Sequence, residues 1–180
     1  MRIISILFAI TLIFTNCTTI HYKNLYTTAD NPKINRLSNM LYQLSGNSYE
    51  SKELATLAIT QSKVLANRYK VVSLPWMQNL LVNTGFKQRG LCYQYVEDLM
   101  PAIKERGFTS FDFKWGQANA NKLNEHNVIV VLKKGSNDFD NGIILDAWRH
   151  SGDLYFTKVK DDPKYHFVDS KEGDRRLGLE

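Results

Sequence analysis

The 180-residue chain lacks long basic runs, a membrane-spanning apolar run and internal repeats, and it has few cysteines. Its Lys and Arg residues are dispersed, with no run of five or more, so the net charge of +5 does not point to nucleic acid as a partner. The apolar run from Ile3 to Phe14 is shorter than the roughly 20 residues that a membrane-spanning helix needs. No repeat or linker divides the chain, and two cysteines allow at most one disulfide. The remaining composition, 43% hydrophobic and 23% charged, is that of a globular domain.

The first 16 residues have the features of a secretory signal peptide: Arg2, the apolar run, and then small or polar residues before Cys17. The stretch resembles the signal of bacterial lipoproteins, in which the cysteine is acylated and becomes the new N-terminus. Asn16 and Phe14 depart from the residues usual at those positions. The resemblance implies export, lipidation of Cys17, and attachment to a membrane facing the periplasm or the cell exterior. Cys92 would then be a single thiol in an oxidising compartment, where a thiol is a liability unless it has a use.

The rest of the chain predicts one α+β domain with N-terminal helices packed on a small antiparallel sheet. Residues 17–30 are polar and indicate a tether, and residues 169–180 indicate a flexible tail. Between them, residues 31–168 form the domain. Helices are predicted near 31–46, 49–69, 76–85 and 91–107, with a kink or break at Pro101. Strands are predicted near 109–115, 127–133, 142–148 and 153–159, of which 127–133 is apolar on both faces and should be central.

Two polar residues are predicted to meet on the sheet. His126 stands at the entrance of one strand and Asp146 lies inside the next, and the segment between these strands is typical of a hairpin loop. Antiparallel pairing across that loop places the two residues opposite or nearly opposite one another, on one face. Asp146 is an acid in an otherwise apolar strand, and a buried carboxylate needs a partner. His126 is the best-placed candidate, although Asp146 pairing with Arg149 is an alternative.

Cys92 completes a candidate catalytic set. At a helix N-terminus its thiolate is favoured by the helix dipole and by backbone N–H groups without partners. Acyl transfer by a thiol needs a nucleophile, a base and a group that orients the base, and Cys92, His126 and Asp146 fit these roles. Each residue alone also fits a structural role, because a lone cysteine is more often packed than reactive. The sequence predicts no cofactor and no metal, although these three residues also form a conceivable zinc site.

These residues resemble the bacterial transglutaminase-like branch of the papain-like cysteine peptidase superfamily. The resemblance rests on Gly90 to Tyr95, on His126 opening a strand, and on Leu145–Asp146 in the next, with separations of 34 and 20 residues. It implies a papain-like core, a catalytic triad of Cys92, His126 and Asp146, and a hydrolase or transferase that acts on peptide, protein or peptidoglycan. Two departures blur the subfamily: no proline follows Asp146, and Asn127 follows the histidine. Gln88 resembles, at a loose spacing, the glutamine that supplies an oxyanion donor.

The function expected from the sequence is therefore that of an exported thiol acyl-transfer enzyme of the cell envelope, either a cysteine protease or amidase or a transglutaminase-like enzyme. A peptidoglycan peptidase of the NlpC/P60 type is the second enzymatic option. A non-catalytic envelope module that binds its ligand with the same fold is the alternative from another class. Resemblance of fold alone does not choose between them.

Overall fold

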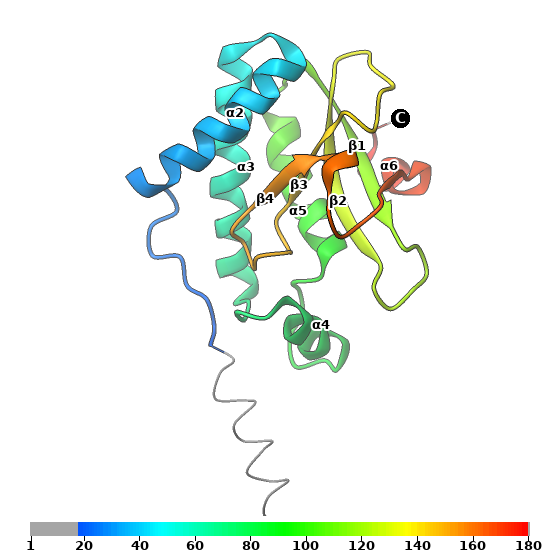
Figure 1. Ribbon diagram of the computed structural model, residues 1–180. Helices are drawn as coiled ribbons and strands as arrows, with labels where there is room; N and C mark the ends of the chain where they lie inside the picture. Colours follow the sequence, from blue (N-terminus) through cyan, green and yellow to red (C-terminus); the bar gives the residue numbers. More distant parts are fainter. Residues whose placement is uncertain (1–17, 180) are drawn as a thin grey trace, which may run out of the picture.

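The computed structural model describes residues 18–179 (Figure 1). Helices come first and consecutive antiparallel strands follow, which confirms the predicted α+β class. Among the described residues no helix is both long enough and apolar enough to cross a membrane. The elements in chain order are η1 (Thr28–Asp30), α2 (Asn31–Ser45), α3 (Ser48–Tyr69), α4 (Pro75–Asn83), α5 (Cys92–Glu105), β1 (Phe111–Ala118), β2 (His126–Lys133), β3 (Ile143–Asp146), β4 (Tyr155–Lys158), η2 (Val159–Asp161), β5 (Val168–Asp169) and α6 (Lys171–Leu177).

The helix ends follow local chemistry. Gly46 ends α2 in the left-handed conformation with φ of +77°, where glycine meets no steric penalty. The side chain of Asn47 accepts a hydrogen bond from the Glu50 N–H and so caps α3. Pro101 lies inside α5 and does not break it, so the predicted break is wrong, whereas the predicted kink stays a prediction. Pro101 is exposed, so the carbonyl group that it leaves without a donor lies on the solvent side of the helix.

The five strands form one antiparallel sheet in the order β4-β3-β2-β1-β5, which makes β2 the central strand as predicted. Alternate residues of β2 face two different apolar clusters. Ile129 and Val131 pack in the large cluster with α2, α3 and α5, whereas Val128 and Val130 pack in a smaller cluster with Tyr165 and other residues from the end of the chain. One face of the sheet is therefore covered by helices, and the other is covered by loops and by the C-terminal segment.

The segment before α2, predicted to be a tether, packs against the domain from residue 18 onward. Thr19 forms an isolated β-bridge with Val72, and the Tyr22 N–H donates to the Asn67 side chain at 2.8 Å. The buried Lys63 ammonium pairs with Asp30 at 2.5 Å. Thr18 to Asp30 are therefore part of the folded body. The predicted signal peptide, residues 1–16, and the predicted lipidation site at Cys17 lie outside the described residues.

The C-terminal segment also differs from the flexible tail that its polar composition predicts. Residues 168–169 pair with β1 as β5, and residues 171–177 form α6. Asp174 anchors this helix, because its buried carboxylate accepts the Trp115 N–H at 2.8 Å and pairs with Lys114 at 2.9 Å. One buried acid thus fixes an otherwise polar helix, and composition alone does not reveal such a contact.

Candidate functional site

The turn before α5 positions Cys92 as the first residue of that helix. The side-chain oxygen of Gln94 accepts the N–H groups of Gly90 (2.7 Å) and Leu91 (3.0 Å), which ties the turn to the helix. Gly90 has a φ of +124°, and a Cβ at this position would lie 2.5 Å from the Gln78 amide. Only glycine fits here without a shift of Gln78. The N–H of Cys92 faces no carbonyl of its own helix, because it belongs to the first turn.

The structure brings His126 and Asp146 together. The His126 Nε2 and an Asp146 carboxylate oxygen are 2.6 Å apart, and both side chains are buried. The register that pairs Ile129 with Leu145 sets the two residues on one face of the sheet but offsets them by two positions along the strands. The contact is therefore diagonal, within the reach that a sheet allows to long side chains.

Asp146 is held by four donors. Besides His126, its carboxylate accepts the Arg149 side chain at 2.9 Å and the backbone N–H groups of Trp148 and Arg149 at 3.1 and 3.0 Å. The Arg149 guanidinium also reaches the buried Asp162 at 2.7 Å. Burial opposes the charge of Asp146, but the charges and hydrogen bonds of His126 and Arg149 keep its pKa below the usual value. This residue is therefore a fixed anion that orients the imidazole.

The environment of His126 favours its protonated form. Burial of the ring opposes the charge, but the Asp146 carboxylate outweighs this effect and the pKa of His126 rises from 6.5 to about 9. Cys92 raises the pKa of His126 further. Because Nε2 faces Asp146, the other ring nitrogen, Nδ1, is available for a reacting group. It is buried and has no hydrogen-bond partner among the described residues.

Asn127 is the second side chain beside the thiol. Its Nδ2 lies 3.8 Å from the Cys92 Sγ, and the same sulfur lies 3.9 Å from the Glu125 carbonyl oxygen. The indole N–H of Trp115 donates to the Asn127 Oδ1 at 2.6 Å, which fixes the amide so that its donor side faces Cys92. A second contact, to the Glu125 carboxylate at 3.1 Å, leaves one N–H of this amide directed towards the sulfur.

Aromatic rings enclose His126. The centroids of Tyr165, Trp148 and Phe167 lie 4.5, 5.0 and 5.8 Å from the centroid of the imidazole. Cys92 itself is only 8% exposed, and the space between it and Trp148 has no room for a water molecule. In this conformation the site is dry and closed on the Trp148 side.

A polar cavity of about 280 Å³ opens on the other side. Glu125 and Asn127, the two residues in contact with the Cys92 sulfur, line it together with Tyr93, Gln117 and residues of α6 that include Arg176. The Arg176 guanidinium lies over the Trp115 ring, 5.2 Å from its centroid. Cys92 does not line this cavity, so Glu125 and Asn127 stand between the cavity and the thiol.

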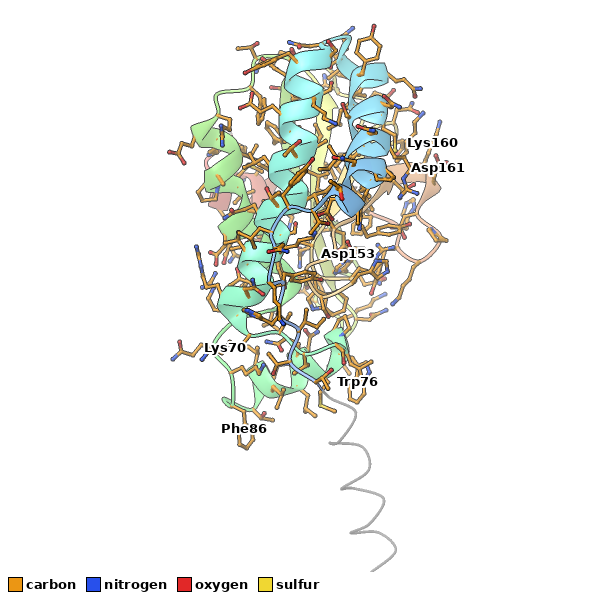
Figure 2. All side chains as sticks on the ribbon, turned by 90° about the vertical axis from the view of Figure 1, so that its left-hand side faces the viewer. Lys70, Trp76, Phe86, Asp153, Lys160 and Asp161 are labelled. Atoms are coloured by element: carbon orange, nitrogen blue, oxygen red, sulfur yellow. The ribbon has the colours of Figure 1, made fainter. Side chains whose placement is uncertain are left out.

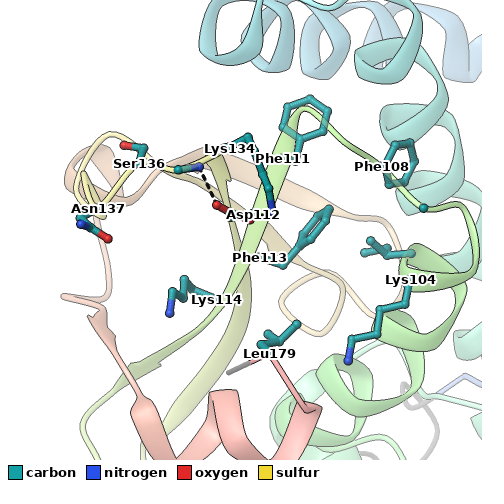
Figure 3. Close-up of a pocket in the computed structure, with 13 residues that line it drawn as sticks. Lys104, Phe108, Phe111, Asp112, Phe113, Lys114, Lys134, Ser136, Asn137 and Leu179 are labelled. Atoms are coloured by element: carbon teal, nitrogen blue, oxygen red, sulfur yellow. Dashed lines mark hydrogen bonds and ion pairs between the residues drawn. The ribbon is translucent and has the colours of Figure 1, made fainter.

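A second cavity, of about 470 Å³, lies elsewhere (Figure 3). Phe108, Phe113, Lys104 and Leu179 line it, and the Lys134–Asp112 ion pair closes one edge at 2.6 Å. It adjoins the end of the β1–β2 ladder where Phe111 pairs with Lys133, whereas His126 is at the opposite end. Since no cysteine or histidine lines this cavity, it lacks the chemistry found around Cys92.

The other predicted site residues stand apart. Gln88 is exposed and has no hydrogen-bond partner within residues 18–179, so its assignment as an oxyanion donor stays a prediction. No group of three potential metal ligands of the kind His, Cys, Asp or Glu occurs among the described residues.

Sequence reasoning missed the roles of Asn127 and Asp162. Asn127 was visible only as a departure from the pattern after the histidine, and its contact with Trp115 depends on the β1–β2 register. Asp162 lies in a polar loop with no periodic signal, and the fold alone brings it to Arg149.

Comparison with models of known protein families, with curated proteins and with solved structures finds no match to this chain.

Proposed function

We propose that the protein is a thiol-dependent acyl-transfer enzyme in which Cys92 is the nucleophile, His126 the acid and base, and Asp146 the residue that orients His126. The observation that carries the proposal is the buried His126–Asp146 pair at 2.6 Å, in which the His126 Nδ1 has no hydrogen-bond partner in the described part of the chain. The next residue of β2, Asn127, has its amide nitrogen 3.8 Å from the Cys92 sulfur, which brings the thiol to this end of the strand. An imidazolium beside a thiol favours the thiolate, which is the nucleophilic form.

The reaction takes two steps. The thiolate of Cys92 attacks an amide or ester carbonyl, a C–S bond forms, and the His126 Nδ1 gives its proton to the leaving amine or alcohol. The resulting thioester is then attacked by water or by a second amine, which loses its proton to Nδ1, and the Cys92 thiolate leaves. Water as the acceptor makes the enzyme a protease or amidase, and an amine makes it a transglutaminase.

Two donors suit the oxyanion that forms during each attack. The Cys92 backbone N–H lies at the start of α5, and the Asn127 amide directs an N–H at the sulfur from 3.8 Å. Donors that are fixed before the reaction stabilise the developing charge without reorganisation. Trp115 supplies this fixation by holding the Asn127 oxygen. The acyl substrate would approach through the 280 Å³ cavity, which Asn127 also lines.

The test measures the reactivity of Cys92 in the whole protein. We expect alkylation by iodoacetamide to be fast below about pH 7, because the imidazolium of His126 is retained there. His126→Ala should abolish this fast reaction, whereas His21→Ala, which removes an exposed histidine from the N-terminal segment, should not. A rate that rises only near the free-thiol value of about 8.5 would refute the proposal.

A second measurement addresses acyl transfer itself. Incubation with an activated ester should add one acyl group to Cys92, detectable by mass spectrometry, and Cys92→Ala should remove it. If Cys92 reacts rapidly with iodoacetamide but never carries an acyl group, the thiol is activated without being an acyl-transfer nucleophile.

A binding module with the same fold is the second candidate, because the thiol is only 8% exposed and the space beside Trp148 is closed. Such a module would bind peptide or peptidoglycan in the 280 Å³ cavity and keep its affinity in Cys92→Ala. Slow alkylation at every pH below the free-thiol range, with unchanged ligand binding in that variant, would favour this candidate over the enzyme.

For location, we propose an exported lipoprotein that is anchored through Cys17. The support is the order of Arg2, the apolar run and Cys17 in the sequence. Metabolic labelling with a fatty acid should mark the full chain and fail to mark Cys17→Ser. Equal labelling of both chains would refute this assignment.

A further inference from the structure

One end of the domain exposes an unusual set of apolar side chains. Trp76, Leu80 and Phe86 are 56%, 49% and 82% exposed, and Leu74 is 37% exposed. They come from α4 and the turns on either side of it and are called the α4 apolar patch here. Figure 2 shows Trp76 and Phe86 at the same end of the molecule. Exposed aromatic residues that gather in one place usually mark a binding surface.

The patch sits on a helix that is rigidly held. Met77 and Gln78 are buried on the inner side of α4, and the Gln78 amide bonds the Val72 N–H at 3.1 Å and the Arg89 carbonyl at 2.8 Å. Trp76 and Leu80 are four residues apart and so share the outer face. The helix therefore presents a fixed apolar surface rather than a loosely packed segment.

The start of the described chain lies at this same end. The Ser73 N–H donates to the Thr18 carbonyl at 3.0 Å, two residues before α4 begins at Pro75. Figures 1 and 2 both place α4 next to the point where the described chain begins. The 17 residues before Thr18 contain the apolar run and Cys17. Whatever holds those residues is thereby brought close to the α4 apolar patch.

The sequence segment that contains the patch carries charges of one sign. Between Glu53 and Glu97 the sequence has no acidic residue, but it has Arg68, Lys70 and Lys87, which flank the patch on both sides in the chain. Arg68 and Lys70 are exposed at the end of α3. Residues 18–29 likewise contain no acid. Basic side chains around exposed Trp, Phe and Leu match the interface of a bilayer with anionic headgroups.

We propose that the α4 apolar patch docks on the surface of a bilayer containing anionic lipid, with Trp76, Leu80 and Phe86 inserted at the level of the headgroups. A single acyl chain gives only marginal membrane binding, and a second contact of this kind makes attachment stable.

The docked surface is also close to the candidate site. Asn79 of α4 accepts the indole N–H of Trp148 at 3.0 Å, and that ring packs against His126. The bilayer would thus hold the Cys92 site in one orientation above the membrane.

The experiment follows the fluorescence of Trp76 in the full chain bound to vesicles of phosphatidylcholine and phosphatidylglycerol with brominated acyl chains. We expect a blue shift and quenching of the Trp76 contribution, defined as the part of the emission that Trp76→Phe removes. Trp115 is 2% exposed, and the half-buried Trp148 donates its indole N–H to Asn79, so the other two tryptophans should be quenched less than Trp76. Replacing Leu80 and Phe86 by serine should lower the quenching, since each side chain contributes apolar area.

A matched control places a tryptophan at the opposite end of α3. Tyr49 is 76% exposed there, and Tyr49→Trp in the Trp76→Phe background should escape the brominated lipid. The proposal is overturned if Trp76 of the vesicle-bound chain stays open to aqueous iodide, which would indicate a protein partner for the patch. It is equally overturned if Trp76 is shielded before vesicles are added and sedimentation shows a dimer. Neither result depends on whether Cys92 is catalytic.

Discussion

The buried His126–Asp146 pair should make the stability of the protein depend on pH above neutrality. The folded state raises the pKa of His126 from 6.5 to about 9, mainly because the charge of Asp146 outweighs the burial of the ring. A group whose pKa is raised by folding stabilises the fold fully below its unfolded pKa. This stabilisation is lost as the pH rises through the folded value. The affected window therefore runs from about pH 6.5 to pH 9.

The magnitude follows from the two pKa values. One pKa unit corresponds to about 1.4 kcal/mol, so a rise from 6.5 to about 9 corresponds to roughly 3 kcal/mol of stabilisation of the imidazolium. For a domain with a total stability of about 5–15 kcal/mol this is a large fraction. Asp146→Asn removes the charge that raises the pKa while it keeps an acceptor for His126 and Arg149. The variant should therefore lose most of this pH dependence.

Urea unfolding from about pH 6 to pH 9 measures the effect directly. The free energy of unfolding of the protein should fall by roughly 3 kcal/mol more across this window than that of His126→Gln, in which the titrating group is absent. His150→Gln removes an exposed histidine and should keep the pH dependence of the parent protein. Parallel pH profiles for the parent and for His126→Gln would refute the assignment of a raised pKa to His126.

Three further predictions concern the surroundings of the site. Arg149→Met leaves two buried carboxylates without their cation and should lower the free energy of unfolding by about 3–5 kcal/mol; a loss below about 1 kcal/mol would contradict this role. Gly173→Ala places a Cβ 2.2 Å from Trp115 and should destabilise by about 1–3 kcal/mol in urea unfolding, whereas Glu172→Ala at the neighbouring exposed position should have little effect. Asn127→Ala should slow hydrolysis of an activated ester about 10²-fold through the lost oxyanion donor, and a rate equal to that of the parent protein would exclude that role.

The sequence predicts the parts of this fold that depend on local periodicity. The helices with clear apolar spacing and end signals, such as Gly46 after α2, are found where expected. The central position of β2 follows from its continuous apolar run. The meeting of His126 and Asp146 also follows, because a hairpin fixes the parity of opposed residues even when the register is off by a position or two.

Contacts between segments distant in the chain escape this reasoning. Asp174 holds α6 through Trp115 and Lys114, about 60 residues earlier, and nothing in the polar composition of residues 169–180 indicates that contact. The same holds for Asp162 and Arg149. In both cases a buried carboxylate pairs with a donor that only the folded sheet brings near it. The sequence around each carboxylate therefore does not reveal its partner.

The rings that enclose His126 come late in the chain, and this has a consequence for how the protein is made. Cys92, His126 and Asp146 are all synthesised well before Tyr165 and Phe167, which pack on the imidazole, and before α6, which lines the cavity. A product that stops short of residue 162 would contain Cys92, His126 and Asp146 and yet lack Asp162, Tyr165 and Phe167, and the α6 side of the cavity. The enclosure of the imidazole is thus completed only when almost the whole chain has folded, so incomplete translation products remain without it.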